Sequence, residues 1–331
     1  MFSKQIDFIA IGDIVTDAFI KLKEAHVTCD INKENCQICM NFGDKIPYDF
    51  VDVIHAVGNS ANAAVSAARL GLSSALIADI GNDENGKECL ESLKTDKVSE
   101  RFVTTHKGML SNYHYVLWYE DDRTILVKHQ DYPRRLPRFP EPKWIYLSSL
   151  GGNSELYHED IAEYLGKHPD VKLAFQPGTF QMSLGIDKLK KIYARADVFF
   201  CNKEEAQRIL NSKEEDVKNL MAMLAKLGPK TIVITDGPKG AYAYDGKESW
   251  FMPPYPDPKP PYERTGAGDA FSSTLTIALA KGLSIDNALR WAPINSMSVV
   301  QYVGAQKGLL SEKALMDWLS KAPSNYQPKK I

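Results

Sequence analysis

The sequence predicts a doubly wound α/β fold, in which helices cover both faces of a mainly parallel sheet. Short apolar runs recur along the 331 residues, and segments with a helical pattern separate them. This alternation is typical of parallel sheets whose strands are connected by helices. A hydrophobic content of 44% is enough to bury a large core. The net charge of -2 gives neither nucleic acid nor an anionic membrane an electrostatic reason to bind the whole molecule.

Six apolar runs have the length and composition of buried parallel strands. They cover residues 7–14, 75–81, 143–149, 171–176, 197–202 and 231–237. Segments between them carry helical patterns with capping or stop residues, at 60–70, 84–94 and 184–196. We expect these elements to build the main sheet and its covering helices.

Two stretches interrupt the alternation of strands and helices. Residues 101–130 contain two β-rich runs around a polar turn, which is typical of a hairpin. Residues 22–56 lack a helical period and end in a strand-like run. From the pattern alone these stretches form either a small projecting sheet or plain surface excursions. We expect all 331 residues to make one domain, with the small sheet formed from about 18–56 and 101–130.

The cysteines and the apolar runs predict a reduced, cytoplasmic protein. No apolar run reaches the roughly 20 residues that span a bilayer. Five cysteines are an odd and sparse set for so long a chain, which favours reduced thiols. Cys29, Cys36 and Cys39 provide only half of a typical zinc site, so a variable loop is favoured over metal binding. The basic run 133–138 is predicted to be a solvated loop, with binding of a substrate phosphate as the alternative.

The segment that carries the chemistry follows a proline-rich connection at 253–264. Gly266, Ala267, Gly268 and Asp269 open an apolar helix that ends at Gly282. The glycines let the backbone approach a ligand, and the amides of the first turn point outward at the positive end of the helix dipole. Such a helix mouth binds phosphate. Asp269 then either caps the helix or accepts a proton from a substrate hydroxyl while the amides hold a phosphoryl group.

The run GAGDAF at the start of this helix resembles the second signature of the ribokinase-like family, the PfkB carbohydrate kinases. The resemblance implies that residues 266–268 form an anion hole and that Asp269 activates the acceptor hydroxyl. The sequence departs from the family pattern where Glu263 replaces an aspartate and Arg264 replaces a threonine. A monovalent cation beside the loop is therefore left open.

Other segments resemble the nucleotide side of the family's site. Asn202 and Glu205 match an Asn-x-x-Glu motif, which implies that Glu205 acts on Mg²⁺ through bound waters. The alternative from the residues alone is an N-cap and its capping box. The resemblance also places four residues beside ATP: Thr235, Gly237, Gly240 and Asn295. A hairpin without ligand is the alternative for residues 231–244, and internal packing is the alternative for Asn295.

The N-terminal half resembles the family's first signature over residues 56–86. The resemblance implies that Asn62 bonds the substrate and that Gly58 lets it approach. It also implies that Asp17 binds sugar hydroxyls through its two acceptor oxygens. Asp13 either assists Asp17 or stabilises a turn. The two strand-rich stretches match the family's lid, which closes over substrate, and exposed aromatic residues on it predict a homodimer.

From these residues we expect an ATP-dependent kinase that phosphorylates a hydroxyl of a small sugar or sugar derivative, with Asp269 as general base. Gln176 stands where sugar kinases often carry an aspartate, so a nucleoside acceptor remains an alternative. A ligand-binding homologue without turnover is a second alternative. A nicotinamide-dependent dehydrogenase is disfavoured, because no G-x-G-x-x-G follows the first strand.

Overall fold

The computed structural model describes residues 6–29, 36–120 and 122–331. Within these residues ten strands form the main sheet, in the order β16-β15-β14-β13-β12-β11-β10-β1-β6-β7. The parallel strands are β1 (Phe8–Ile11), β6 (Ser74–Gly81), β7 (Ser99–His106), β10 (Trp144–Leu147), β11 (Lys172–Phe175), β12 (Val198–Asn202) and β13 (Thr231–Thr235). Three antiparallel strands extend the β13 edge: β14 (Ala241–Tyr244), β15 (Ser249–Met252) and β16 (Lys329–Lys330).

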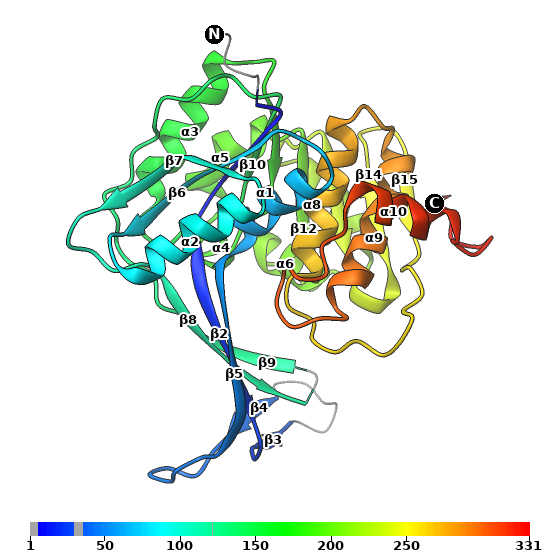
Figure 1. Ribbon diagram of the computed structural model, residues 1–331. Coiled ribbons are helices and arrows are strands. Elements are labelled where there is room, and N and C mark those ends of the chain that lie inside the picture. Colours follow the sequence, from blue (N-terminus) through cyan, green and yellow to red (C-terminus); the bar gives the residue numbers. More distant parts are fainter. Residues whose placement is uncertain (1–5, 30–35, 121) are drawn as a thin grey trace.

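Helices cover both faces of this sheet, which confirms the doubly wound prediction (Figure 1). One face carries α1 (Asn59–Arg69), α2 (Glu84–Thr95), α8 (Ala267–Ala280), α9 (Ile285–Val299) and α10 (Glu312–Ser320). The other carries α3 (Glu155–Lys167), α4 (Thr179–Leu184), α5 (Ile186–Arg195), α6 (Lys203–Leu210) and α7 (Val217–Ala225). Strand β1 shows why: Phe8 and Ala10 enter one hydrophobic cluster, while Ile9 and Ile11 enter the other. A strand buried on both faces is apolar throughout.

A second, four-stranded sheet projects from the helices and the main sheet (Figure 1). This small sheet has the order β5-β2-β8-β9, from β2 (Val15–Leu22), β5 (Tyr48–Val57), β8 (Tyr113–Tyr119) and β9 (Asp122–Leu126). The pair β3 (His26–Thr28) and β4 (Gln37–Cys39) lies near its far end. The predicted range needs one correction, because residues 101–106 belong to β7 of the main sheet. A β-rich composition does not say which sheet a strand joins.

The two faces of the small sheet differ in exposure. Ala18 pairs with Val53 on one side and with Tyr115 on the other, which makes these residues share a face. Several apolar side chains on that face are exposed: Val51, Val53, Tyr115 and Leu126. The opposite face buries Phe19, Val116 and Trp118. The Trp118 ring meets Tyr262 edge-on, with 5.1 Å between centroids, so this face is turned toward the rest of the molecule.

The prediction of reduced thiols is wrong at the far end of the small sheet. Cys29 and Cys36 form a disulfide, whereas Cys39, Cys89 and Cys201 are free thiols. The β3–β4 pairing explains the bond: Thr28 lies opposite Gln37, so the next residue on each strand is one of the two cysteines. No described helix combines the length and apolar character needed to cross a membrane.

Candidate active site

The mouth of α8 is built by two glycines with different roles. Gly266 is the N-cap of α8 and has a φ of 81°. A Cβ on it would lie 2.3 Å from the Ala305 Cβ, so the turn requires glycine for both conformation and space. A Cβ on Gly268 would meet no atom within 4 Å. Gly266 therefore serves the fold, and Gly268 leaves room for a ligand beside the first amides of the helix.

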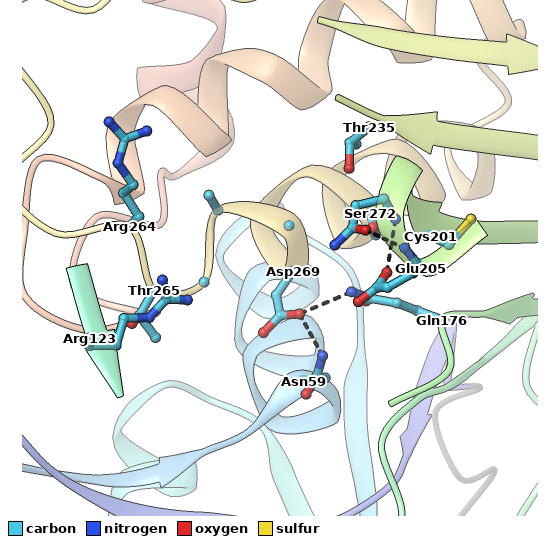
Figure 2. A pocket seen from close by; sticks show the side chains of 14 residues that line it. Asn59, Arg123, Gln176, Cys201, Glu205, Thr235, Arg264, Thr265, Asp269 and Ser272 are labelled. Carbon is cyan, nitrogen blue, oxygen red and sulfur yellow. Dashed lines mark hydrogen bonds between the residues drawn. The ribbon is translucent and has the colours of Figure 1, made fainter. Parts of the chain in front are cut away.

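A pocket of about 280 Å³ opens at this helix mouth. The ends of three parallel strands contribute to it, because Gln176 follows β11, Asn202 ends β12 and Thr235 ends β13. Ligands of doubly wound folds bind at this carboxyl edge of the sheet. Figure 2 shows side chains from these strands facing α8 across the pocket. The full lining is Asn59, Arg123, Gln176, Cys201, Asn202, Glu205, Thr235, Arg264, Thr265, Gly266, Ala267, Gly268, Asp269 and Ser272.

Three side-chain amides hold the Asp269 carboxylate, and Figure 2 draws the bonds from two of them, Asn59 and Gln176. Asn59 Nδ2 donates to Oδ1 at 2.9 Å, and Asn62 Nδ2 donates to Oδ2 at 2.8 Å. Gln176 Nε2 also donates to Oδ1, at 3.2 Å. Burial raises the pKa of Asp269 above its ordinary value, although the amides favour the charged form. The carboxylate is therefore oriented and is a stronger base than an exposed aspartate.

Asn62 bonds Asp269, and Gly58 begins α1. Their predicted contacts with substrate stay predictions. Asn62 accepts a bond from Gln306 Nε2 at 3.0 Å, which fixes its amide so that the NH₂ group faces Asp269. It therefore positions the carboxylate. Gly58 is the N-cap of α1 with a φ of 106°, and a Cβ there would lie 2.8 Å from the carbonyl oxygen of Asp13. Gly58 is thus needed by the turn that begins α1.

Asn202 and Glu205 form the capping box that the residues alone suggested. The Asn202 side chain accepts from the Glu205 backbone at 2.7 Å, and the Glu205 carboxylate accepts from the Asn202 backbone at 2.8 Å. Both residues nevertheless line the pocket. Burial raises the pKa of Glu205, so a cation nearby would favour its charged form. Its hard oxygens fit a water-mediated contact with Mg²⁺.

Among the residues with assigned positions, no group of three or more His, Cys, Asp or Glu side chains is close enough to hold a metal ion by itself. Mg²⁺ commonly binds through one or two carboxylates together with substrate phosphates and water, which does not require such a group. The donor set around Glu205 is of that sparse kind.

The remaining nucleotide predictions meet the pocket only at Thr235. Gly237 and Gly240 lie in the connection between β13 and β14, beyond the pocket lining. A Cβ on Gly240 would lie 2.5 Å from the Met252 carbonyl oxygen, so this glycine is required by the turn. Asn295 is 0% exposed and cannot touch a ligand here. Its amide instead donates to Thr274 at 2.8 Å and accepts from the Leu310 backbone at 2.9 Å, which is the packing alternative.

Asp13 is a partner in a buried ion pair, which contradicts its predicted place at the substrate. Arg134 Nη2 lies 2.6 Å from Asp13 Oδ1, and the backbone N–H of Gly151 donates to Oδ2 at 2.7 Å. Burial opposes the charge, but His129 and Arg134 together hold the pKa of Asp13 below its ordinary value. The Arg134 side chain is only 2% exposed. The prediction that 133–138 is a solvated loop is therefore wrong at Arg134, because this arginine is paired with a buried carboxylate.

Asp17 lies on β2, on the same face of the small sheet as Phe19. His114 is its neighbour on β8 in the strand register, and its Nδ1 lies 3.3 Å from Asp17 Oδ1. The His114 Nε2 is buried and has no hydrogen-bond partner among the described residues. The pair offers polar groups on the side of the small sheet that faces the main sheet, outside the lining of the pocket at α8.

Glu263 does not provide a site for a monovalent cation. Its carboxylate is 0% exposed and accepts from the backbone N–H and hydroxyl of Thr265 at 2.8 and 2.6 Å. The backbone N–H of Gly304 donates to the other oxygen at 3.3 Å. Arg123 Nε lies 3.8 Å from this carboxylate. Because both oxygens accept from neutral donors and the Arg123 guanidinium lies beside Oε1, the residues present do not fit a metal cation.

Several pocket residues were not predicted as site residues: Asn59, Arg123, Gln176, Arg264, Thr265, Cys201 and Ser272. One signal was available for Gln176, because a polar residue directly after a buried parallel strand lies at the carboxyl edge of the sheet. Asn59 stands one position after the N-cap of α1 and carried no separate signal. Arg123 is 146 residues from Asp269 in sequence, and only the folded small sheet brings it to the pocket.

An anion-binding helix mouth beside an oriented carboxylate suits transfer of a phosphoryl group to a hydroxyl, which defines a class of small-molecule kinase. The comparisons with known proteins agree with this class. A family model described as pfkB family carbohydrate kinase matches residues 24–312. The chain therefore belongs to the pfkB family of carbohydrate kinases, and it is an ATP-dependent kinase.

Relatives of known name include kinases for both sugars and nucleosides. A ribokinase from Bacillus subtilis is 25% identical over 270 residues, which cover 80% of this chain and 87% of the relative. A cytidine kinase from Thermococcus kodakarensis is 27% identical over 70% of this chain and 83% of its own. The solved ribokinase of Arabidopsis thaliana, complexed with ribose and ATP, superposes with a TM-score of 0.79 at 19% identity. That likeness covers 96% of this chain and 99% of the solved chain and shows the fold.

Proposed function

We propose that this kinase transfers the γ-phosphoryl group of ATP to a hydroxyl of a small sugar or sugar derivative, with Asp269 as the general base. The observation that carries the proposal is the Asp269 carboxylate, held by three amides at the mouth of α8 inside the pocket. The raised pKa of Asp269 supports proton acceptance. The space at Gly268 supports close approach of phosphate.

In this proposal each group of the pocket has a separate role in the reaction. Asp269 accepts the proton of the acceptor hydroxyl, whose oxygen then attacks the phosphoryl group in line with the leaving group. The outward amides of residues 266–268 hold the oxygens of that group as negative charge develops. Glu205 would hold Mg²⁺ through bound waters, and the ion would reduce the charge of the triphosphate.

Replacement of Asp269 by asparagine tests the base directly. Asp269→Asn keeps the size of the side chain and removes the proton acceptor. We expect turnover to fall by about 10²–10⁴-fold, the range for loss of a general base, while ATP binding changes little. Product formation and calorimetric ATP binding measure the two effects. Near-normal turnover in Asp269→Asn would exclude this residue as the base.

Polar groups on the small sheet support a hydroxyl-rich acceptor. Asp17 and His114 face the main sheet as neighbours, and the buried His114 Nε2 has no hydrogen-bond partner among the residues placed in the structure. A sugar hydroxyl can donate to the carboxylate and bond the ring nitrogen at the same time. We propose that these two residues bind the acceptor. The small sheet would then act as a lid that closes over it, within a single kinase domain in a cytoplasmic protein.

A nucleoside acceptor is the second candidate. Phe180 is partly exposed and meets His129 edge-on, with 5.3 Å between centroids, which offers an aromatic surface to a base. The relative from Thermococcus kodakarensis is named a cytidine kinase. An ATP-consumption screen across sugars, sugar phosphates and nucleosides separates these candidates. Mapping the phosphorylated hydroxyl then identifies the product, whereas consumption with none of them would favour a homologue without turnover.

We also propose that two copies pair through the exposed face of the small sheet. Val51, Val53, Tyr115 and Leu126 form apolar surface on one side of a thin sheet. Light scattering should give about twice the chain mass of 37.0 kDa. Val53→Lys together with Leu126→Lys should give the single-chain mass, because lysines on both surfaces would repel. A double variant that stays paired would place the interface elsewhere.

A further inference from the structure

The Glu263 carboxylate is a buried charge at the entrance to the catalytic loop. The hydrogen bonds that it accepts come from neutral donors, two from Thr265 and one from Gly304. They tie the residue before Gly266 to a distant segment of the chain. A carboxylate with 0% exposure also needs a positive charge nearby, because neutral donors only partly replace its hydration.

Arg123 brings that positive charge from the small sheet. Its Nε lies 3.8 Å from Glu263 Oε1. Arg123 pairs with Trp118 across β8 and β9, so both side chains are on the face turned toward the main sheet. Trp118 meets Tyr262, the residue before Glu263. The small sheet thus contacts two successive residues just ahead of the catalytic loop, once through a ring and once through a charge.

The same guanidinium also belongs to the catalytic pocket. Arg123 lines the pocket together with Gly268 and Asp269, and Figure 2 shows it next to Thr265, away from Gln176. Its charge favours the ionised form of Asp269 and so acts against the effect of burial on the pKa of Asp269. A guanidinium stays protonated in proteins, so the charge is permanent. It also attracts an anionic phosphoryl group.

We propose that Arg123 is the enzyme's own cation: it neutralises Glu263 and presents positive charge to the transferred phosphoryl group in place of a monovalent metal ion. The inference rests on the proposed kinase function. Two consequences follow from its position on β9. Turnover does not depend on K⁺ or Na⁺. The charge reaches the pocket only while the small sheet lies against the loop, so the position of that sheet controls transfer.

The first experiment measures turnover of the unmodified enzyme in tetramethylammonium salts, with ATP supplied as its tetramethylammonium salt. The measurement is then repeated with added KCl. We expect turnover to change less than about twofold between the two conditions, because Arg123 already supplies the charge. We also expect no rise in melting temperature when K⁺ replaces tetramethylammonium. An absolute need for K⁺ or Na⁺, or a clear rise in melting temperature with K⁺, would overturn the inference.

The second experiment compares Arg123→Ala with Arg101→Ala, a control on β7 outside the pocket. Loss of a charge that acts on the transferred group should lower kcat of Arg123→Ala by about 10²–10³-fold, with a smaller effect on KM for ATP. Guanidinium at low, non-denaturing concentration should restore part of the rate, and Arg101→Ala should behave as the unmodified enzyme. Normal turnover by a folded Arg123→Ala, or a loss without rescue, contradicts the proposal.

The two proposals fail in different ways. If Asp269→Asn keeps full turnover, the assigned base is wrong, while the guanidinium rescue of Arg123→Ala still tests the cation. If no acceptor gives turnover, the kinase proposal fails, and the melting temperature in K⁺ still decides whether a metal cation binds. If Arg123→Ala does not fold, the response of the unmodified enzyme to K⁺ remains decisive.

Discussion

Asp269 experiences opposing influences from its immediate neighbours. Burial favours the neutral acid, whereas amide donors and the charge of Arg123 favour the carboxylate. The balance leaves its pKa raised, which suits a group that must accept a proton and later release it. Gln176 is the donor at the longest distance, 3.2 Å, and Tyr146 donates to its amide oxygen from behind. The strength of the base therefore depends on the side chains that hold the carboxylate.

Removal of one donor should shift the pH dependence of the rate. Gln176→Leu removes the amide that stabilises charged Asp269, so the pKa of Asp269 rises further. Since the base must be ionised, activity is lost as pH falls through this pKa, and the acid limb of kcat/KM moves to higher pH. At pH values below the acid limb of the unmodified enzyme, kcat/KM of Gln176→Leu should be about tenfold lower than that of the unmodified enzyme. At higher pH, kcat/KM of the variant should recover in part.

A matched substitution outside the pocket gives the control for this pH profile. Gln207→Leu makes the same chemical change on α6, where the amide bonds the Glu214 carbonyl oxygen. Its acid limb should coincide with that of the unmodified enzyme. A limb that stays in place for Gln176→Leu, or moves to lower pH, would show that this amide does not stabilise the charged base.

At the scale of the element, the stability of the turn that begins α8 and the access of a ligand to it depend on different glycines, two positions apart. Gly266 has a positive φ and is packed against Ala305, whereas Gly268 has helical geometry and open space. Glycine is expected where the backbone is left-handed or where another group comes close. Gly266 meets both conditions, whereas Gly268 meets neither within the protein and leaves open space beside the helix mouth. The two glycines of this motif are therefore needed for different physical reasons.

Alanine substitutions should separate the two requirements. Gly266→Ala places a Cβ in a left-handed turn and against Ala305, so we expect a loss of about 2 kcal/mol or more in the free energy of unfolding. Gly268→Ala should keep the melting temperature within about 2 °C, because nothing opposes its Cβ. Its turnover should fall by about tenfold or more, since the methyl group stands where phosphate approaches the amides. Thermal unfolding and steady-state kinetics test both variants.

Two results would contradict this division of roles. If Gly266→Ala is as stable as the unmodified protein, the turn does not require glycine. If Gly268→Ala keeps full turnover, the open space at the helix mouth is not used by the phosphoryl group. The pair serves as its own control, because each variant adds one methyl group to the same turn.

At the scale of the whole molecule, the sequence predicted those features that depend on residues close together in the chain. Burial on both faces makes parallel strands apolar throughout, so the main strands and their alternation with helices were visible in the sequence. The loop from Gly266 to Asp269 was also visible in the sequence, because its glycines and its carboxylate are close neighbours in the chain. Long-range pairing was not visible. The membership of 101–106 in the main sheet depends on β6, and the burial of Arg134 depends on Asp13, 121 residues earlier.

The site shows the same limit at Arg123 and Glu263. Each is an ordinary charged residue in its own segment, one after a polar turn and the other after a proline-rich connection. Their meeting requires the small sheet to pack beside the mouth of α8. Asn295 illustrates the opposite error, because a polar residue in a helix interior was assigned to the nucleotide while its bonds serve packing.

The order in which the chain is made gives the Asp269 contacts a further meaning. Two donors, Asn59 and Asn62, belong to the first fifth of the sequence, Gln176 lies near its middle, and Asp269 lies in the last fifth. Protein synthesis proceeds from the N-terminus, and early segments can fold before late ones emerge. The growing chain can assemble the early donors without their carboxylate. If Asp269 is the base, as proposed above, a nascent chain has no complete catalytic site until α8 has left the ribosome, and a chain that terminates before α8 has no general base.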